Sequence, residues 1–192
     1  NNAYIENTNI NFSGREITIG EDNEYFFDLD LLWYKNSSFD TSIEIVSEVL
    51  EFLNIRDIDI YTTSVSVVGS LGMVPIVSYL AKIQKIQKIL LTREVESSIY
   101  ELCPSSHLFR REDLQGCKAI VFKDIMAGGY SVMRTSEILN SLGIEIELIF
   151  CLIDIRPDNH LFTKNSYLKN TKFVSLLSGR NPFSFINGKH KK

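Results

Sequence analysis

Short β-branched runs alternate with helical patterns along this 192-residue chain, and this alternation constrains the fold more than any other feature. The runs that predict strands cover residues 17–19, 25–29, 58–68, 88–91, 119–122, 145–152 and 173–176. Apolar residues at helical spacing predict helices over 41–53, 74–85 and 131–142. Strand–helix alternation over residues 41–152 predicts an α/β fold with a mostly parallel sheet, helices on both faces and right-handed crossovers.

Particular residues account for the predicted helix boundaries. Asp40 or Thr41 is a suitable N-cap for the first helix, because its side-chain oxygen can accept a hydrogen bond from a free backbone N–H. Pro75 fits the first turn of the second helix, and Gly143 fits the left-handed position that ends the third. No polar or Pro/Gly-rich stretch in the first 180 residues is long enough to be a linker, so we expect one domain.

Composition argues against several classes of function. A net charge of −4 and a pI near 5.4 do not suit broad electrostatic binding to nucleic acid, and the basic tail 189–192 is expected to be a solvated end. The longest apolar runs, such as 144–155, contain acidic residues and are too short to cross a bilayer. Cys103, Cys117 and Cys151 show neither CxxC spacing nor a nearby pair of histidines. We therefore expect a reduced, cytoplasmic setting, with small molecules rather than nucleic acid or membrane as partners.

Two loops at predicted strand ends, 69–75 and 124–131, combine glycine with polar residues. Ligands of parallel α/β sheets bind at the carboxyl ends of the strands, so function is expected in these loops. In the second loop, backbone amides near Gly129 can converge on an anion with a helix dipole behind them. The Ser131 hydroxyl can add a donor, and Asp124 can accept from ribose hydroxyls. An ordinary strand-to-helix turn with Ser131 as N-cap is the alternative.

The stretch AIVFKDIMAGGYSVM, residues 119–133, resembles the signature of the type I phosphoribosyltransferases, which is an apolar strand, two acidic residues and a Thr/Gly/Ser phosphate loop. The resemblance implies that the 5-phosphate of phosphoribosyl pyrophosphate (PRPP) is bound by Ala127, Gly128, Gly129, Tyr130 and Ser131. Asp124 takes the second acidic position, which grips the ribose hydroxyls, whereas Lys123 replaces the first acid. Lys123 can lie beside the ribose, turn outward to pair with a phosphate, or be a solvated strand-end lysine.

Further segments of the chain resemble the same family in the same order. VVGSLGMVP, residues 67–75, looks like the pyrophosphate loop, which implies that Ser70, Leu71 and Gly72 bind pyrophosphate. LTREV, residues 91–95, corresponds to the strand end before a mobile catalytic loop in orotate enzymes, and 97–116 to that loop and its return. ITIGEDNEYFFDLDLL, residues 17–32, resembles their hood. The expected organisation is one phosphoribosyltransferase-like, Rossmann-like domain over 1–192: a hood at about 1–40, a core at 41–180 and a tail at 181–192.

The predicted catalytic residues are Asp124, Arg93 and Lys123. Arg93 is the candidate cation for the departing pyrophosphate, and its alternative is a structural ion pair with Glu94, Glu96 or another neighbour. Glu94 and Glu96 stand where the family carries basic residues. The resemblance also implies Mg²⁺ bound with PRPP, with Asp124 as a candidate ligand, and a homodimer.

Three functions follow as hypotheses. The first is an orotate-like phosphoribosyltransferase of pyrimidine biosynthesis, which transfers ribose 5-phosphate from PRPP to a nitrogenous base and releases pyrophosphate. The second is a catalytically impaired domain of this family that binds PRPP or a nucleotide in a regulatory or assembly role, as the departures at Lys123 and Glu94 suggest. The third is an unrelated doubly wound domain that binds another phosphorylated ligand.

Overall fold

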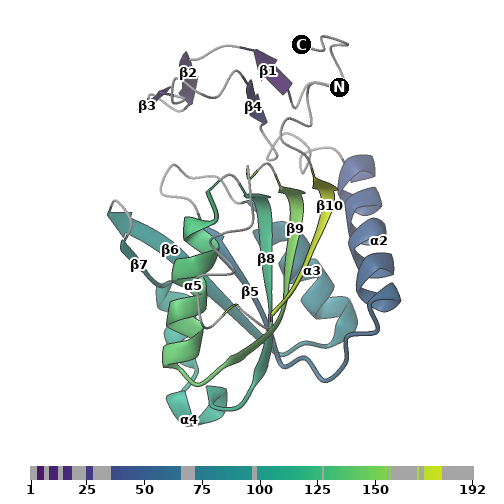
Figure 1. Cartoon of the computed structure of the whole chain (residues 1–192), viewed down its shortest axis with the longest axis vertical. Helices are drawn as coiled ribbons and strands as arrows, with labels where there is room; N and C mark the ends of the chain where they lie inside the picture. Colours follow the sequence, from purple (N-terminus) through teal and green to yellow (C-terminus); the bar gives the residue numbers. More distant parts are fainter. Residues whose placement is uncertain are drawn as a thin grey trace.

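The computed structural model describes residues 4–6, 9–12, 15–18, 25–27, 36–65, 72–96, 99–126, 128–154, 156, 168 and 171–178. Among these residues the centre is a six-stranded sheet in the order β10-β9-β8-β5-β6-β7 (Figure 1). The strands are β5 (Ile60–Val65), β6 (Lys88–Glu96), β7 (Ile99–Leu102), β8 (Lys118–Met126), β9 (Glu145–Asp154) and β10 (Lys172–Ser178). Only the β6–β7 pair in this sheet is antiparallel, which confirms the predicted, mostly parallel α/β fold.

The order of the strands defines a switch point in the sheet. Numbered along the chain, the parallel strands β5, β6, β8, β9 and β10 have the spatial order 2-1-3-4-5. Strand β5 therefore lies between β6 on one side and β8 on the other, and the winding direction reverses there. Open parallel sheets bind ligands at such a switch point, outside the carboxyl ends of the two central strands. The ends of β5 and β8 are thus the first place to look for a site.

Helices cover both faces of the sheet, as predicted (Figure 1). Helices α2 (Asn36–Phe52) and α3 (Val74–Gln84) bury Val46 and Leu80 in one hydrophobic cluster, against Phe122 of β8. Helices α4 (Arg111–Leu114) and α5 (Tyr130–Ser141) bury Leu114 and Leu139 in the other cluster. None of the helices in the described part is long and apolar enough to cross a membrane.

Two predicted helix boundaries are confirmed and one is wrong. Helix α3 carries Pro75 in its first turn, and Gly143 adopts a left-handed φ of +77° just after α5. Helix α2, however, begins at Asn36, so Asp40 and Thr41 lie inside it rather than capping it. The early start has a tertiary cause, because the Phe39 ring in the first turn packs edge-on against Tyr79 of α3.

Strands β6 and β8 run further than their apolar patterns predict. Their expected ends were Leu91 and Phe122, but the strands reach Glu96 and Met126. Ladder partners extend them, because β8 pairs with β9 up to its last residue and β6 pairs with β7. Lys123 and Asp124 therefore lie in a strand, whereas a loop starting at residue 124 was predicted. The segment 97–116 contains β7, the 3-10 helix η1 (Pro104–Leu108) and α4, with residues 97 and 98 outside the described ranges.

The amino-terminal segment forms two antiparallel pairs of short strands. Strand β1 (Tyr4–Glu6) pairs with β4 (Tyr25–Phe27), and β2 (Asn9–Phe12) pairs with β3 (Arg15–Thr18). Figure 1 shows these strands beyond the end of the sheet toward which β8, β9 and β10 point. This is the segment for which the sequence predicted a hood. The predicted tail 181–192 lies outside the described residues.

Candidate phosphate-binding site at the switch point

Gly72 brings the first predicted loop against the ends of β5 and β8. Its φ is +50°, a left-handed conformation that L side chains rarely adopt. A Cβ added at Gly72 would lie 3.1 Å from Asp124 Oδ2 and 3.8 Å from the Ser64 carbonyl oxygen. The loop after β5 therefore approaches the carboxylate of β8 closely. Ser70 and Leu71, the other predicted pyrophosphate-binding residues, lie outside the described residues.

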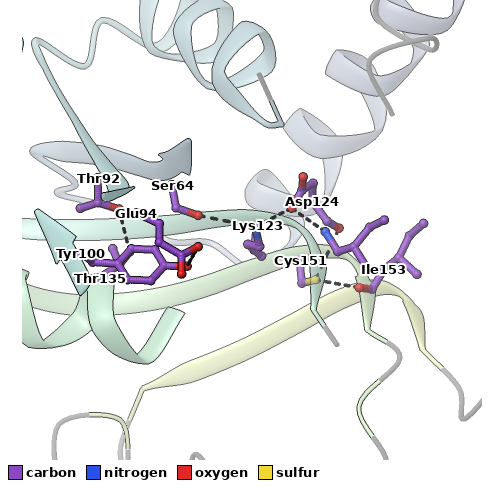
Figure 2. A network of polar contacts seen from close by, with 10 residues as sticks. Ser64, Thr92, Glu94, Tyr100, Lys123, Asp124, Thr135, Cys151 and Ile153 are labelled. Atoms are coloured by element: carbon purple, nitrogen blue, oxygen red, sulfur yellow. Dashed lines mark hydrogen bonds and ion pairs between the residues drawn. The ribbon is translucent and has the colours of Figure 1, made fainter. Parts of the chain in front are cut away.

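An ion pair joins Lys123 and Asp124 at the end of β8. Lys123 Nζ lies 2.8 Å from Asp124 Oδ1, and the two side chains are only 18% and 19% exposed. Lys123 Nζ also lies 3.5 Å from Ser64 Oγ on the neighbouring strand β5, at the limit for a hydrogen bond. Figure 2 shows Lys123 between Ser64 and Asp124. The sequence left three positions open for the Lys123 side chain. In the structure its ammonium group lies at the switch point and pairs with the adjacent residue, Asp124.

The carboxylate of Asp124 is largely occupied by the protein. Oδ1 accepts a hydrogen bond from the Ile125 backbone amide at 2.7 Å as well as the contact with Lys123. Side chains alternate between the two faces of a strand, so residues three positions apart are expected on opposite faces. Phe122 and Ile125 nevertheless belong to the same hydrophobic cluster, so the alternation is interrupted between them. In this arrangement Asp124 holds Lys123 and its own backbone, and Oδ2 is directed at Gly72.

The amino terminus of α5 forms the second half of the candidate site. Gly129 is its N-cap, with φ 78° and no side-chain capping bond. The first N–H groups of an α-helix have no partner within the helix, so those of Tyr130 and Ser131 are available to an anion. Ser131 lies inside the helix, which rules out the alternative of Ser131 as N-cap. Ala127 lies outside the described residues.

Gly128 and Tyr130 shape the entrance to this loop. A Cβ at Gly128 would lie 3.1 Å from Tyr130 Cδ2, so the backbone there runs against the tyrosine ring. Tyr130 is exposed and leaves its phenol on the surface.

A neighbouring carboxylate neutralises Arg93. Its guanidinium contacts Glu101 Oε1 through Nε at 2.9 Å and Nη2 at 2.6 Å, and the side chains are 45% and 47% exposed. The two residues face each other across the β6–β7 pair. Glu94, considered as a partner of Arg93, instead accepts a hydrogen bond from the Tyr100 hydroxyl at 3.3 Å. Burial, with the Glu94 charge, raises the pKa of Tyr100 to about 12.

Sequence reasoning missed Ser64. Ser64 follows two threonines near the end of β5, and its place close to the strand end was a signal that the sequence did contain. Cys151 is buried beside the site, where its thiol donates to the Ile153 carbonyl oxygen at 3.1 Å. Burial raises the pKa of the Cys151 thiol to about 12, so it stays protonated and unreactive at neutral pH.

The predicted magnesium ligand does not fit a protein-built metal site in this arrangement. Within the described ranges, no three His, Cys, Asp or Glu side chains gather closely enough to hold a metal ion. Asp124 already shares Oδ1 with an ammonium group at 2.8 Å. Since Mg²⁺ prefers free carboxylates, phosphate oxygens and water, any Mg²⁺ here would have to be held mainly by the ligand.

Solved structures of phosphoribosyltransferases match the chain over most of its length. The orotate phosphoribosyltransferase from Aeropyrum pernix has a TM-score of 0.64 at 14% identity, covering 98% of this chain and 94% of that chain. The adenine phosphoribosyltransferase from Leishmania tarentolae has a TM-score of 0.64 at 11% identity, covering 84% and 80%. The adenine phosphoribosyltransferase from Saccharomyces cerevisiae has a TM-score of 0.61 at 17% identity, covering 91% and 94%.

No protein-family model and no curated protein matches the sequence. The structural likeness is nevertheless consistent, since adenine and orotate phosphoribosyltransferases match with similar TM-scores. The six-stranded sheet, its helical layers and these neighbours agree with one another. The chain therefore has the α/β fold of the type I phosphoribosyltransferases.

Proposed function

We propose that this chain binds PRPP at the switch point and transfers its ribose 5-phosphate to a nitrogenous base with release of pyrophosphate. The observation that carries the proposal is the close approach of Gly72 to Asp124 at the ends of β5 and β8. That contact joins the first predicted anion-binding loop to the strand that leads into the second. A ligand with phosphates at both ends of a ribose suits two such loops.

The predicted loops and Arg93 each have a role in this proposal. The amides of residues 128–131 and the dipole of α5 bind the 5-phosphate, with Ala127 completing the loop. Ser70, Leu71 and Gly72 bind the pyrophosphate. Arg93 stabilises the departing pyrophosphate after exchanging Glu101 for the ligand; an exposed pair of this kind contributes only ~0–1 kcal/mol, so the exchange costs little.

The chemistry demands positive charge around a strongly anionic leaving group. The transition state resembles an oxocarbenium ion, and amides that are already oriented stabilise the departing pyrophosphate without reorganising. Each charge-assisted contact of this kind is typically worth a few kcal/mol, or about two to three decades of rate. Mg²⁺ carried by PRPP would supply further positive charge. The chain itself would supply positive charge through the Lys123 ammonium and the backbone amides at the start of α5.

The base is the most specific part of the proposal. The likeness of residues 17–32 to the orotate hood favours an orotate-like pyrimidine, and pyrimidine biosynthesis as the setting. Adenine enzymes share the fold equally well, so a purine base belongs in the same test. A homodimer and a cytoplasmic location accompany the enzymatic proposal as predictions.

A second candidate is a domain that binds PRPP or a nucleotide without turning it over. The specific observation in its favour is that both candidate cations are neutralised. Lys123 pairs with Asp124, and Arg93 pairs with Glu101. Such a domain would serve a regulatory or assembly role. The two candidates share a ligand and differ in the release of pyrophosphate.

Calorimetric titration with PRPP and Mg²⁺, followed by an assay for pyrophosphate release, separates the candidates. Orotate, uracil, adenine, hypoxanthine and guanine are offered as bases. Release that depends on one base supports the enzyme. Binding without release for any base supports the binding domain. If PRPP does not bind, whereas another phosphorylated compound does, the fold serves a different ligand and the proposal is wrong.

A further inference from the structure

The cluster of Ser64, Lys123 and Asp124 pairs a largely buried cation with a carboxylate at the ends of β5 and β8. A lysine whose side chain is only 18% exposed stands at the switch point, where the ligand is proposed to bind. Burying an ammonium group costs free energy unless a partner compensates, and Asp124 is that partner. The chain thus places a fixed cation at the mouth of a phosphate site.

The hydrogen-bonding capacity of Lys123 exceeds what its neighbours use. An ammonium group has three hydrogens to donate. Among the described residues it has one short contact, to Asp124 Oδ1 at 2.8 Å, and one long contact, to Ser64 Oγ at 3.5 Å. A phosphate oxygen is a stronger acceptor than the serine hydroxyl, because the bond would be charge-assisted on both sides. An anionic ligand at the switch point can therefore replace the Ser64 contact.

Asp124 has the complementary arrangement. Oδ1 is shared by Lys123 and the Ile125 amide, and Oδ2 is directed at Gly72. The carboxylate is thereby neutralised and turned toward the protein. Its first effect is to hold the Lys123 ammonium in place, and a metal ion at the same oxygen would be repelled by that ammonium.

We propose that Lys123 binds a phosphate oxygen of PRPP, that Asp124 is a positioning residue for it, and that PRPP binding at this site does not require Mg²⁺. This rests on the proposed function for the identity of the ligand. Of the positions that the sequence left open for Lys123, it takes the pairing with a phosphate, and it replaces the expected role of Asp124 as the residue that grips the ribose. The ammonium group brings one positive charge to the phosphates and is held in place by its ion pair with Asp124.

The test is calorimetric titration of the purified full chain with PRPP in two buffers, one with Mg²⁺ and one with EDTA. For the wild-type chain the expected Kd is the same within about threefold in both buffers. The double variant Lys123→Met/Asp124→Asn removes both charges and leaves no unpaired buried charge, so it is expected to fold. In EDTA it should bind PRPP about ten- to a hundredfold more weakly, and Mg²⁺ should restore part of the loss.

Two further variants separate the roles. Asp124→Asn keeps an oxygen that accepts from Lys123 but leaves the ammonium without its counter-charge, so its folding is first checked by circular dichroism. Its Kd in EDTA is expected to change by less than about fivefold. Arg110→Met removes an exposed arginine from another ion pair, with Asp113, and is the control for loss of one positive charge. It should bind PRPP as the wild-type chain does in both buffers.

The outcomes that overturn the inference are distinct from failure of the proposed function. Binding by the wild-type chain that needs Mg²⁺, with an unchanged Kd in the double variant, overturns the role of Lys123 and leaves PRPP as the ligand. A loss in Asp124→Asn as large as that in the double variant shows that Asp124 contacts the ligand itself, which also overturns it. No binding of PRPP to the wild-type chain in either buffer overturns the proposed function and this inference together.

Discussion

At the scale of single residues, Gly72 and Gly116 show how much a neighbour matters. Both have positive φ angles, +50° and +78°. A Cβ at Gly72 would lie 3.1 Å from Asp124 Oδ2, whereas a Cβ at Gly116 would meet nothing within 4 Å. Both positions therefore require a residue that tolerates a positive φ, but of the two only Gly72 lies in the candidate site. A substitution at Gly116 is expected to affect folding alone, whereas one at Gly72 is expected to affect ligand binding as well.

Alanine at each of the two positions tests this distinction. Gly72→Ala and Gly116→Ala should each lower the free energy of unfolding by about 1–2 kcal/mol, the cost of a side chain in the left-handed region. Only Gly72→Ala should weaken PRPP binding, by about tenfold or more, because its methyl group displaces the Asp124 carboxylate. Urea unfolding and calorimetry measure the two effects. Equal PRPP affinities in both variants would show that Gly72 is not at the ligand.

At the scale of elements, the site depends on how α5 is held against the sheet. Thr92 of β6 and Thr135 of α5 share a buried hydrogen bond of 2.8 Å between their hydroxyl oxygens (Figure 2). Both side chains are almost completely buried, so each hydroxyl has little access to water. The bond connects the helix whose amino terminus faces the proposed phosphate to the strand that carries Arg93. It is a direct side-chain hydrogen bond between the helix and the sheet.

A double-mutant cycle on this pair has a defined expectation. Thr92→Val alone should lower the free energy of unfolding by about 1–3 kcal/mol, because the Thr135 hydroxyl then stays buried without its partner. The double variant Thr92→Val/Thr135→Val should recover most of that loss, because no polar atom of the pair remains. Urea unfolding of both single variants and the double variant gives the coupling. Strictly additive losses would show that the two hydroxyls contribute independently.

At the scale of the whole molecule, one sheet supports two hydrophobic cores. Tyr61, Phe122 and Phe150 form a chain of ring contacts on the face covered by α2 and α3. Cys151 lies in the core on the opposite face. Burial raises the pKa of Cys151 from 9.0 to about 12 and that of Tyr61 from 10.0 to about 12. Both cores therefore contain an acid that the folded state keeps protonated.

Stability at high pH should report this burial. A group whose pKa is raised on folding contributes fully below its unfolded pKa, and the contribution is lost as pH rises toward the folded pKa. For Cys151 that range is about pH 9 to 12. The wild-type chain should lose about 1 kcal/mol more than Cys151→Val between pH 9 and pH 10, measured by urea unfolding. Identical pH profiles for the two proteins would mean that the thiol is not protected by the fold.

The order of the elements and the location of the site follow from local patterns in the sequence. Apolar spacing identified the three long helices and the parallel strands of the central sheet, because such periodicity depends only on neighbours along the chain. Pro75 and Gly143 marked helix boundaries for the same reason. The loops at the ends of β5 and β8 could be assigned to the site from sequence, since ligands of parallel sheets bind at the carboxyl ends of strands.

Which charged side chains contact each other is determined by the tertiary structure and could not be predicted from the sequence. Register between β6 and β7 brings Glu101 to Arg93, and the junction of β5 with β8 brings Ser64 to Lys123. It also decided where elements begin and end, as α2 does through the ring contact of Phe39 with Tyr79. These outcomes depend on distances between residues far apart in the chain, which periodicity does not encode. The sequence thus determined the frame of the fold and the position of the candidate site, and packing determined which charged groups meet there.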